Sequence, residues 1–220
     1  MTTQSVPARR TEPRWPAILA LIAVLALVQL LPSRYQFTPP WFPWTVVAIV
    51  IAVMLAVTFA PTSILWHRIE RSIVIVVFFL VFGLNVLAVS RLVGDMITHR
   101  HGYSGITLLE SGAVIWAVNV LVFALLYWQL DRSGPEARAA GASGGADFHF
   151  AQSYAGDEPS GWEPRFVDYL YIAFATSTAF GPPDHARPVS HRAKVMLMAQ
   201  AGISLVTLVL IASRAVSTLS

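Results

Sequence analysis

Long apolar segments separated by short polar stretches dominate this chain. Five of them run for 16 to 22 residues and are nearly free of charge over most of their length. This pattern is typical of helices that cross the ~30 Å hydrocarbon core of a bilayer. The five segments are residues 16–31, 44–59, 73–89, 112–130 and 195–216. We therefore predict an all-α fold, a polytopic transmembrane helix bundle with five spans.

A sixth apolar run, residues 166–180, is shorter than the others. Its 15 residues would form a helix of about 22 Å, which is too short to cross the hydrocarbon core. Gly181, Pro182 and Pro183 follow it and would end the helix. We predict a re-entrant helix that dips into the membrane. If this run crosses the membrane instead, the carboxyl terminus changes sides.

The chain divides into two regions on this interpretation. Residues 1–111 form an amino-terminal membrane region with three spans. Residues 112–220 form a pore-loop-like module that consists of a span, a polar linker, the re-entrant helix and the last span. The linker, residues 133–161, is rich in Gly, Ala and Ser, and we expect it to be flexible and to bury no core of its own.

Composition supports a membrane protein. Hydrophobic residues make up 55% of the chain and charged residues 12%, about half the share of a soluble domain. Tryptophans lie at the ends of the apolar segments, where the membrane meets water. The net charge of +3 is spread over the loops rather than gathered on one face, so we expect the lipid bilayer as a partner and no nucleic acid.

The distribution of Arg and Lys predicts the orientation. With five spans, 11 basic residues lie on the side of the amino terminus and of the linker, and 4 lie on the other side. Basic residues are enriched in cytoplasmic loops. We predict a protein of the cell membrane with a cytoplasmic amino terminus, an external carboxyl terminus and a re-entrant helix that enters from the cytoplasm.

The last span carries a polar stripe. Gln200, Ser204 and Thr207 follow one another at helical spacing, and Ile211, Arg214 and Thr218 continue the series. Such a stripe avoids lipid. It either lines a water-filled path or joins helices through hydrogen bonds, and small residues on the same helix favour the second interpretation.

Other polar residues in or beside the spans are expected to have structural roles. Asn85 and Asn119 each suit an interhelical hydrogen bond. Arg165 and Asp168 are three residues apart and could pair at the start of the short helix. Residues Asp95, His99 and His101 are expected in a solvated loop rather than at a metal site, and His185 and His191 at the membrane interface.

Catalytic motifs do not occur in this sequence. It contains no Gly-rich phosphate loop, no HExxH, no paired intramembrane carboxylates and no Cys. We expect a protein that is not an enzyme and that uses no cofactor or metal.

The carboxyl-terminal third resembles known proteins in two ways. Residues 131–135 (DRSGP), 165–171 (RFVDYLY), 174–180 (FATSTAF) and 183–184 (PD) resemble an uncharacterised family of bacterial multi-pass integral membrane proteins. The layout from 130 to 219 is also similar to the two-helix pore domain of tetrameric potassium channels. The second resemblance implies self-association into a homo-oligomer and a filter built from Thr176, Ser177, Thr178, Gly181 and Asp184.

These residues define the candidate site, which joins the five positions of that loop to Gln200, Ser204 and Thr207. Pro182 and Pro183 hold φ near −65° and cannot form a potassium filter, so the hypothesis is an ion channel-like pore loop without potassium selectivity. Its orientation is also opposite to that of the channels, whose pore loops enter from outside. The alternatives are a non-conducting structural or interaction membrane protein and, third, a small-solute carrier.

Overall fold

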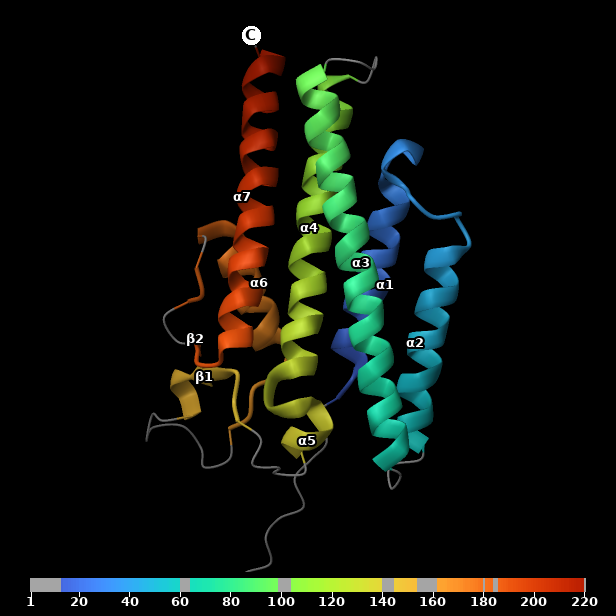
Figure 1. Cartoon of the computed structure of the whole chain (residues 1–220), viewed down its shortest axis with the longest axis vertical. Coiled ribbons are helices and arrows are strands. Elements are labelled where there is room, and N and C mark those ends of the chain that lie inside the picture. Colours follow the sequence, from blue (N-terminus) through green and yellow to red (C-terminus); the bar gives the residue numbers. More distant parts are fainter. Residues whose placement is uncertain are drawn as a thin grey trace, which may run out of the picture.

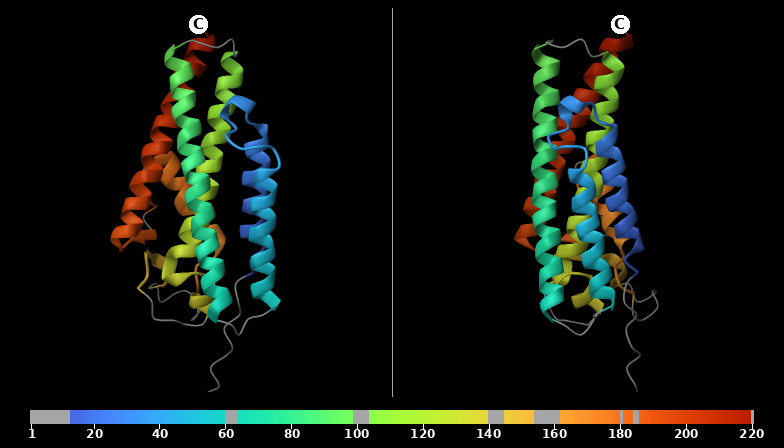
Figure 2. Two further views of the ribbon diagram at one scale, coloured as in Figure 1. Left: turned by 45° about the vertical axis from the view of Figure 1, so that its right-hand side comes forward. Right: turned by 90° about the vertical axis from the view of Figure 1, so that its right-hand side faces the viewer.

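The protein is a bundle of long helices that lie side by side along its longest axis (Figures 1 and 2). The computed structural model describes residues 13–59, 64–98, 104–139, 145–153, 162–179, 181–183 and 186–219. The helices are α1 (Trp15–Leu30), α2 (Phe42–Phe59), α3 (Ile64–Thr98), α4 (Gly105–Leu130), α5 (Pro135–Ala139), α6 (Phe166–Ala179) and α7 (His191–Leu219). Three 3₁₀ turns (Ser33–Tyr35, Asp131–Ser133, Ala151–Ser153) and the strands β1 (Phe148–Phe150) and β2 (Ala186–Pro188) complete the described elements.

Helix α4 lies at the centre of the bundle. It packs against α1, α3, α6 and α7, and 56% of the positions in its apolar window are buried, against 28% in α3 and 22% in α7. An apolar helix that is buried on most sides needs partners for its few polar groups. The polar side chains of α4 are therefore expected to form hydrogen bonds with the neighbouring helices.

Among the described residues, three helical segments are long and apolar enough to cross a membrane: Ile75–Met96, Gly105–Ser133 and His191–Val216. The first and third lie in α3 and α7, and the second covers α4 and the 3₁₀ turn after it; by length and composition they suggest a membrane protein. Helices α1 and α2 have 16 and 18 residues, or about 24 and 27 Å. They are shorter because Pro32 ends the first segment and Pro39 and Pro40 delay the second. By length alone, three of the five predicted spans are found.

Helix α3 is twice as long as predicted. The apolar segment 73–89 is the middle of a helix of 35 residues, Ile64–Thr98. Its polar flanks include Arg91 and Asp95, which are compatible with a helix and therefore continue it. The prediction that Asp95 lies in a loop is wrong, whereas His99 and His101 lie outside the described residues.

A sharp reversal ends α4. Arg132 and Ser133 have φ of +48° and +68°, and Gly134 has φ of +103°. Two successive residues with side chains in the left-handed region are costly unless the surrounding contacts hold them. Asp131, immediately before them, is fully buried and supplies such contacts. The reversal is thus tied to one carboxylate.

The linker is more ordered than its composition predicted. After the reversal, β1 pairs with β2 in an antiparallel two-stranded sheet with Phe148 opposite Pro188 and Phe150 opposite Ala186. Phe148 and Phe150 are buried among aromatic side chains of α4 and α6, while His149 is exposed. The expectation that residues 133–161 bury no core is therefore wrong for Asp147 to Phe150. Residues 140–144 and 154–161 lie outside the described part.

The segment that contains the short helix α6 begins and ends at the same end of the bundle. Figure 1 shows that α6 starts near the end of the bundle where α4 finishes, that β2 lies at that same end, and that α7 runs from there to the opposite end. Pro164 precedes α6, and the N–H of Arg165 donates to Asp168 Oδ2 at 2.7 Å. Asp168 thus caps the helix through the backbone of Arg165. The 14 residues of α6 agree with the short helix predicted there.

Candidate functional site

The polar stripe of α7 faces the interior of the protein. Gln200, Ser204 and Thr207 are all completely buried. Gln200 Nε2 donates to the carbonyl oxygen of Ala173 at 2.8 Å and to Ser177 Oγ at 2.9 Å, and the hydroxyl of Tyr127 donates to Gln200 Oε1 at 2.5 Å. One amide therefore joins α7 to both α6 and α4.

Ser204 continues this connection toward α3. Asn119 Nδ2 on α4 donates to Ser204 Oγ at 2.9 Å, and Asn85 Nδ2 on α3 reaches Asn119 Oδ1 at 3.5 Å. The interhelical role predicted for Asn85 and Asn119 is confirmed. Thr207 differs, because its hydroxyl donates to the carbonyl oxygen of Ile203 in its own helix at 2.8 Å.

One turn further along, α4 and α7 approach closely. A methyl group placed on Gly112 would lie 2.7 Å from Cγ1 of Ile211. Ile211 belongs to the predicted stripe and fills the space that Gly112 leaves open. The stripe therefore combines hydrogen bonds with close packing, which are the two means by which helices associate in membranes.

The three hydroxyls predicted to form a filter do not converge. Thr176, Ser177 and Thr178 lie in the last turns of α6, where successive side chains point about 100° apart. Thr176 and Ser177 are completely buried, whereas Thr178 is exposed and donates to the carbonyl oxygen of Phe174 at 2.9 Å. Thr176 Oγ1 is buried without a hydrogen-bond partner. Ser177 is the one that contacts Gln200.

Gly181 and Asp184 complete the predicted loop. Gly181 follows α6 at a half-buried position, and a methyl group added to it would meet no atom within 4 Å. Asp184 lies outside the described residues, as does His185. The structure therefore brings Ser177 and Gln200 together and leaves Thr178 and Gly181 apart from them.

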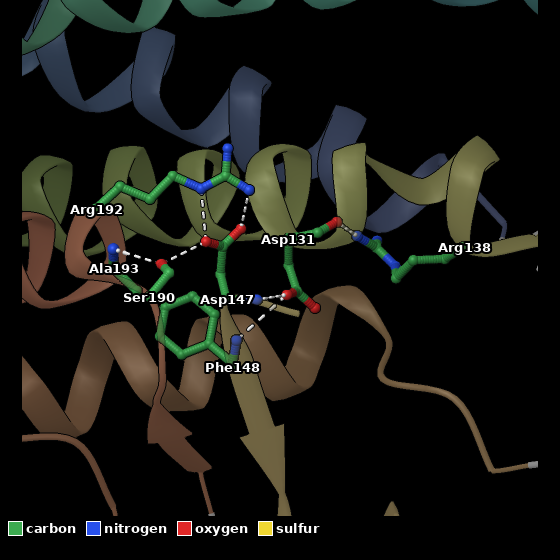
Figure 3. A network of polar contacts seen from close by, with 7 residues as sticks. All are labelled: Asp131, Arg138, Asp147, Phe148, Ser190, Arg192 and Ala193. Carbon is green, nitrogen blue, oxygen red and sulfur yellow. Dashed lines mark hydrogen bonds and ion pairs between the residues drawn. The ribbon is translucent and has the colours of Figure 1, made fainter. Parts of the chain in front are cut away.

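A second polar cluster lies at the carboxyl-terminal end of α4 (Figure 3). The sequence analysis did not predict it. Asp131 Oδ1 accepts hydrogen bonds from the N–H groups of Asp147 at 2.7 Å and Phe148 at 3.3 Å, and its Oδ2 accepts the hydroxyl of Tyr169 at 2.6 Å. Arg138 Nη1 donates to the carbonyl oxygens of Asp131 and Trp128. One carboxylate thus fixes the reversal after α4, the strand β1 and the helix α6.

Asp147 makes the corresponding connection to α7. Its carboxylate is buried and receives two hydrogen bonds of 2.6 Å from Arg192, Nε to Oδ1 and Nη2 to Oδ2. The hydroxyl of Ser190 donates to Asp147 Oδ1 at 2.5 Å and accepts the N–H of Ala193 at 3.1 Å, so Ser190 also caps α7. This is a bidentate Arg–carboxylate ion pair, which is stronger than one with a single hydrogen bond.

The sequence analysis named Asp168 as a structural carboxylate and did not name Asp131 or Asp147 as buried ones. Asp168 accepts the backbone N–H of Arg165 at the start of α6, whereas Asp131 and Asp147 are completely buried. The sequence does indicate a strand next to Asp147, because hydrophobic and polar residues alternate from Phe148 to Phe150, as they do in a half-buried strand. For Asp131 the only signal was its place at the end of a long apolar segment.

A second ion pair lies toward the other end of the bundle. Arg34 donates from Nε and Nη2 to the two carboxylate oxygens of Asp95 at 2.6 and 2.7 Å, and the hydroxyl of Tyr35 reaches Oδ2 at 3.1 Å. The turn after α1 is thereby fastened to α3. Within the described part of the chain, no group of three or more His, Cys, Asp or Glu side chains is placed to hold a metal ion.

Each of these clusters joins elements that are distant in the sequence, and each acidic group described above has its charge paired or hydrogen-bonded. Such an arrangement holds helices in place. Comparisons with protein-family models, with curated proteins and with solved structures each find no match.

Proposed function

We propose that this chain is a multi-pass protein of a cell membrane in which α6 is a re-entrant helix. The support is the path of the chain: α6 has 14 residues, or about 21 Å, it starts near one end of the bundle, and β2, which follows it in the sequence, lies at that same end. Asp131 and Asp147 hold that end together, and polar groups of this kind belong at a membrane surface or inside protein.

We further propose that a single chain has a structural or interaction role and conducts no ions. The observation that carries this is the burial of Gln200, Ser204 and Thr207, the residues that a permeation path through the bundle would expose. Gln200 and Ser204 are hydrogen-bonded to α4 and α6, and Thr207 to its own helix. A lining group must be free to replace part of the hydration shell of an ion.

A channel formed between copies of the chain is the second candidate. Thr178 and Gly181, at the tip of α6, are accessible in the single chain, and pore loops of oligomeric channels meet at such tips. This arrangement would require self-association, with Thr178 rather than Ser177 facing the path.

Ion flux separates the two candidates. Purified protein in liposomes loaded with a fluorescent ion indicator is expected to give the same flux as empty liposomes, with an ionophore as the positive control. Flux above that background would overturn the non-conducting proposal. If Thr178→Leu then removes the flux and Ser204→Leu does not, the path lies between copies rather than inside one chain.

The re-entrant helix gives a separate prediction for accessibility. The chain has no Cys, so single cysteines can be introduced at Gly145 and Gly181, where added atoms meet open space, and at Ser104 at the opposite end. In intact cells an impermeant thiol reagent is expected to label Ser104→Cys and to spare Gly145→Cys and Gly181→Cys. After permeabilisation, Gly145→Cys becomes reactive.

Gly181→Cys distinguishes a dipping helix from a crossing one. If α6 is re-entrant, Gly181→Cys should stay unlabelled in intact cells, as Gly145→Cys does, and should react only with reagent that reaches the cytoplasmic side. Labelling of Gly181→Cys from outside, together with protection of Gly145→Cys, would mean that α6 crosses the membrane. Labelling of Gly145→Cys in intact cells would reverse the predicted orientation.

A further inference from the structure

An apolar cavity of about 90 Å³ lies between α1, α2 and α3, on the side of α4 away from α7. Its walls are formed mainly by aliphatic side chains, among them Val24, Val46 and Leu84. A second cavity of about 50 Å³ shares four of its lining residues and continues toward Trp128. Both are lined mainly by apolar side chains, and their volumes suit a few methylene groups of a hydrocarbon chain and no polar solute.

The guanidinium group of Arg91 lies beside the end of the cavity that Phe37 lines. Phe37 lines the cavity, and the guanidinium carbon of Arg91 lies 4.0 Å from the centre of its ring. Arg91 Nη1 donates to the carbonyl oxygen of Arg34 at 2.9 Å. Among the described residues, the contacts of Arg91 are therefore a ring and a neutral carbonyl. The neighbouring Arg34 differs, because Asp95 neutralises it.

Two exposed tryptophans near the amino-terminal end of α2 indicate where the membrane interface lies. Trp41 and Trp44, just before and in the first turn of α2, are 62% and 58% exposed. Tryptophan is enriched where the hydrocarbon core of a membrane meets the headgroups. Arg91 is exposed and lies five residues before the end of the apolar segment Ile75–Met96, so we expect its guanidinium to reach the headgroups beside the cavity.

We propose that this cavity and Arg91 form a binding site for one anionic phospholipid. One acyl chain lies against α1, α2 and α3 with a few of its methylene groups in the cavities, and the phosphate contacts the guanidinium of Arg91. A zwitterionic lipid fits less well, because its own cation competes with Arg91 for the phosphate. The site is independent of whether the protein conducts ions, since it lies on the opposite side of α4 from the α6–α7 contact.

The test is lipid binding by native mass spectrometry of the purified full chain, with phosphatidylglycerol and phosphatidylcholine of equal chain length. The wild type is expected to prefer phosphatidylglycerol about five- to tenfold, as one Arg near a phosphate would give. Arg91→Gln should remove the preference, and Arg187→Gln, an exposed Arg on β2, should keep it. Val46→Phe, which fills the cavity from a half-buried position, should weaken binding of both lipids.

Three results of the binding measurement would overturn the proposal. These are equal binding of both lipids by the wild type, an unchanged preference in Arg91→Gln, and displacement of the phospholipid by an equal concentration of oleate, which would identify a fatty-acid site. In case Val46→Phe does not fold, a phospholipid with a photoreactive diazirine in its acyl chain provides an independent measurement on the wild type. It should label α1, α2 and α3, and labelling of α7 alone would refute the site.

Discussion

Replacing Asp131 with Ala is expected to destabilise the protein by on the order of 3–5 kcal/mol. The carboxylate is completely buried and accepts hydrogen bonds from two backbone N–H groups and from the hydroxyl of Tyr169. Without it, these three donors stay buried and lose their acceptor. The reversal at Arg132 and Ser133, with its two left-handed residues, also loses the contact that holds it.

Thermal unfolding in detergent, followed by tryptophan fluorescence, measures this effect. A lowering of the midpoint by about 10 °C is expected for Asp131→Ala. Asp131→Asn should fall between Asp131→Ala and the wild type, because its carbonyl oxygen still accepts the N–H groups of Asp147 and Phe148. Glu110→Ala, an exposed carboxylate on the same helix, is the matched control and should unfold as the wild type does. Equal midpoints for Asp131→Ala and Glu110→Ala would show that the cluster contributes nothing.

Replacing Gln200 with Leu should give the second large effect, about 3–6 kcal/mol at 1–2 kcal/mol for each of the three lost hydrogen bonds. Leu has nearly the same size but neither donates nor accepts. Tyr127 and Ser177 lose their partner, and α6 loses its polar connection to α7. If Gln200 instead lined a water-filled path, removing its amide would release polar groups to water and cost little.

A double-mutant cycle assigns the loss to the buried hydrogen bond. Tyr127→Phe and Gln200→Leu remove the two sides of one contact, so the double variant should lose less stability than the sum of the single ones. Gly202→Ala provides the control on α7, since the added methyl group meets open space and should leave stability unchanged or raise it slightly. Additive losses in the cycle would contradict the hydrogen bond between Tyr127 and Gln200.

The apolar segments were sufficient to predict the class of protein and the position of most helices. Hydrophobic length is a local property, because a membrane requires about 20 apolar residues and a backbone that satisfies its own hydrogen bonds. The short helix before Gly181 was predicted for the same reason. Helix ends were predicted less well, as α3 shows. The apolar segment indicates only the part of a helix that suits the membrane, whereas the helix continues through polar residues that are compatible with helical geometry.

The partners of the polar side chains depended on how the helices pack. The spacing of Gln200, Ser204 and Thr207 placed them on one face of α7, but a polar face can meet water or another helix equally well. Only the position of α4 and α6 against that face shows that Gln200 meets Tyr127 and Ser177. Asp131 and Asp147 were missed because their partners come from β1, α6 and α7, up to 45 residues away. The cost of a buried charge is offset by contacts that are long-range in the sequence, and no local pattern records them.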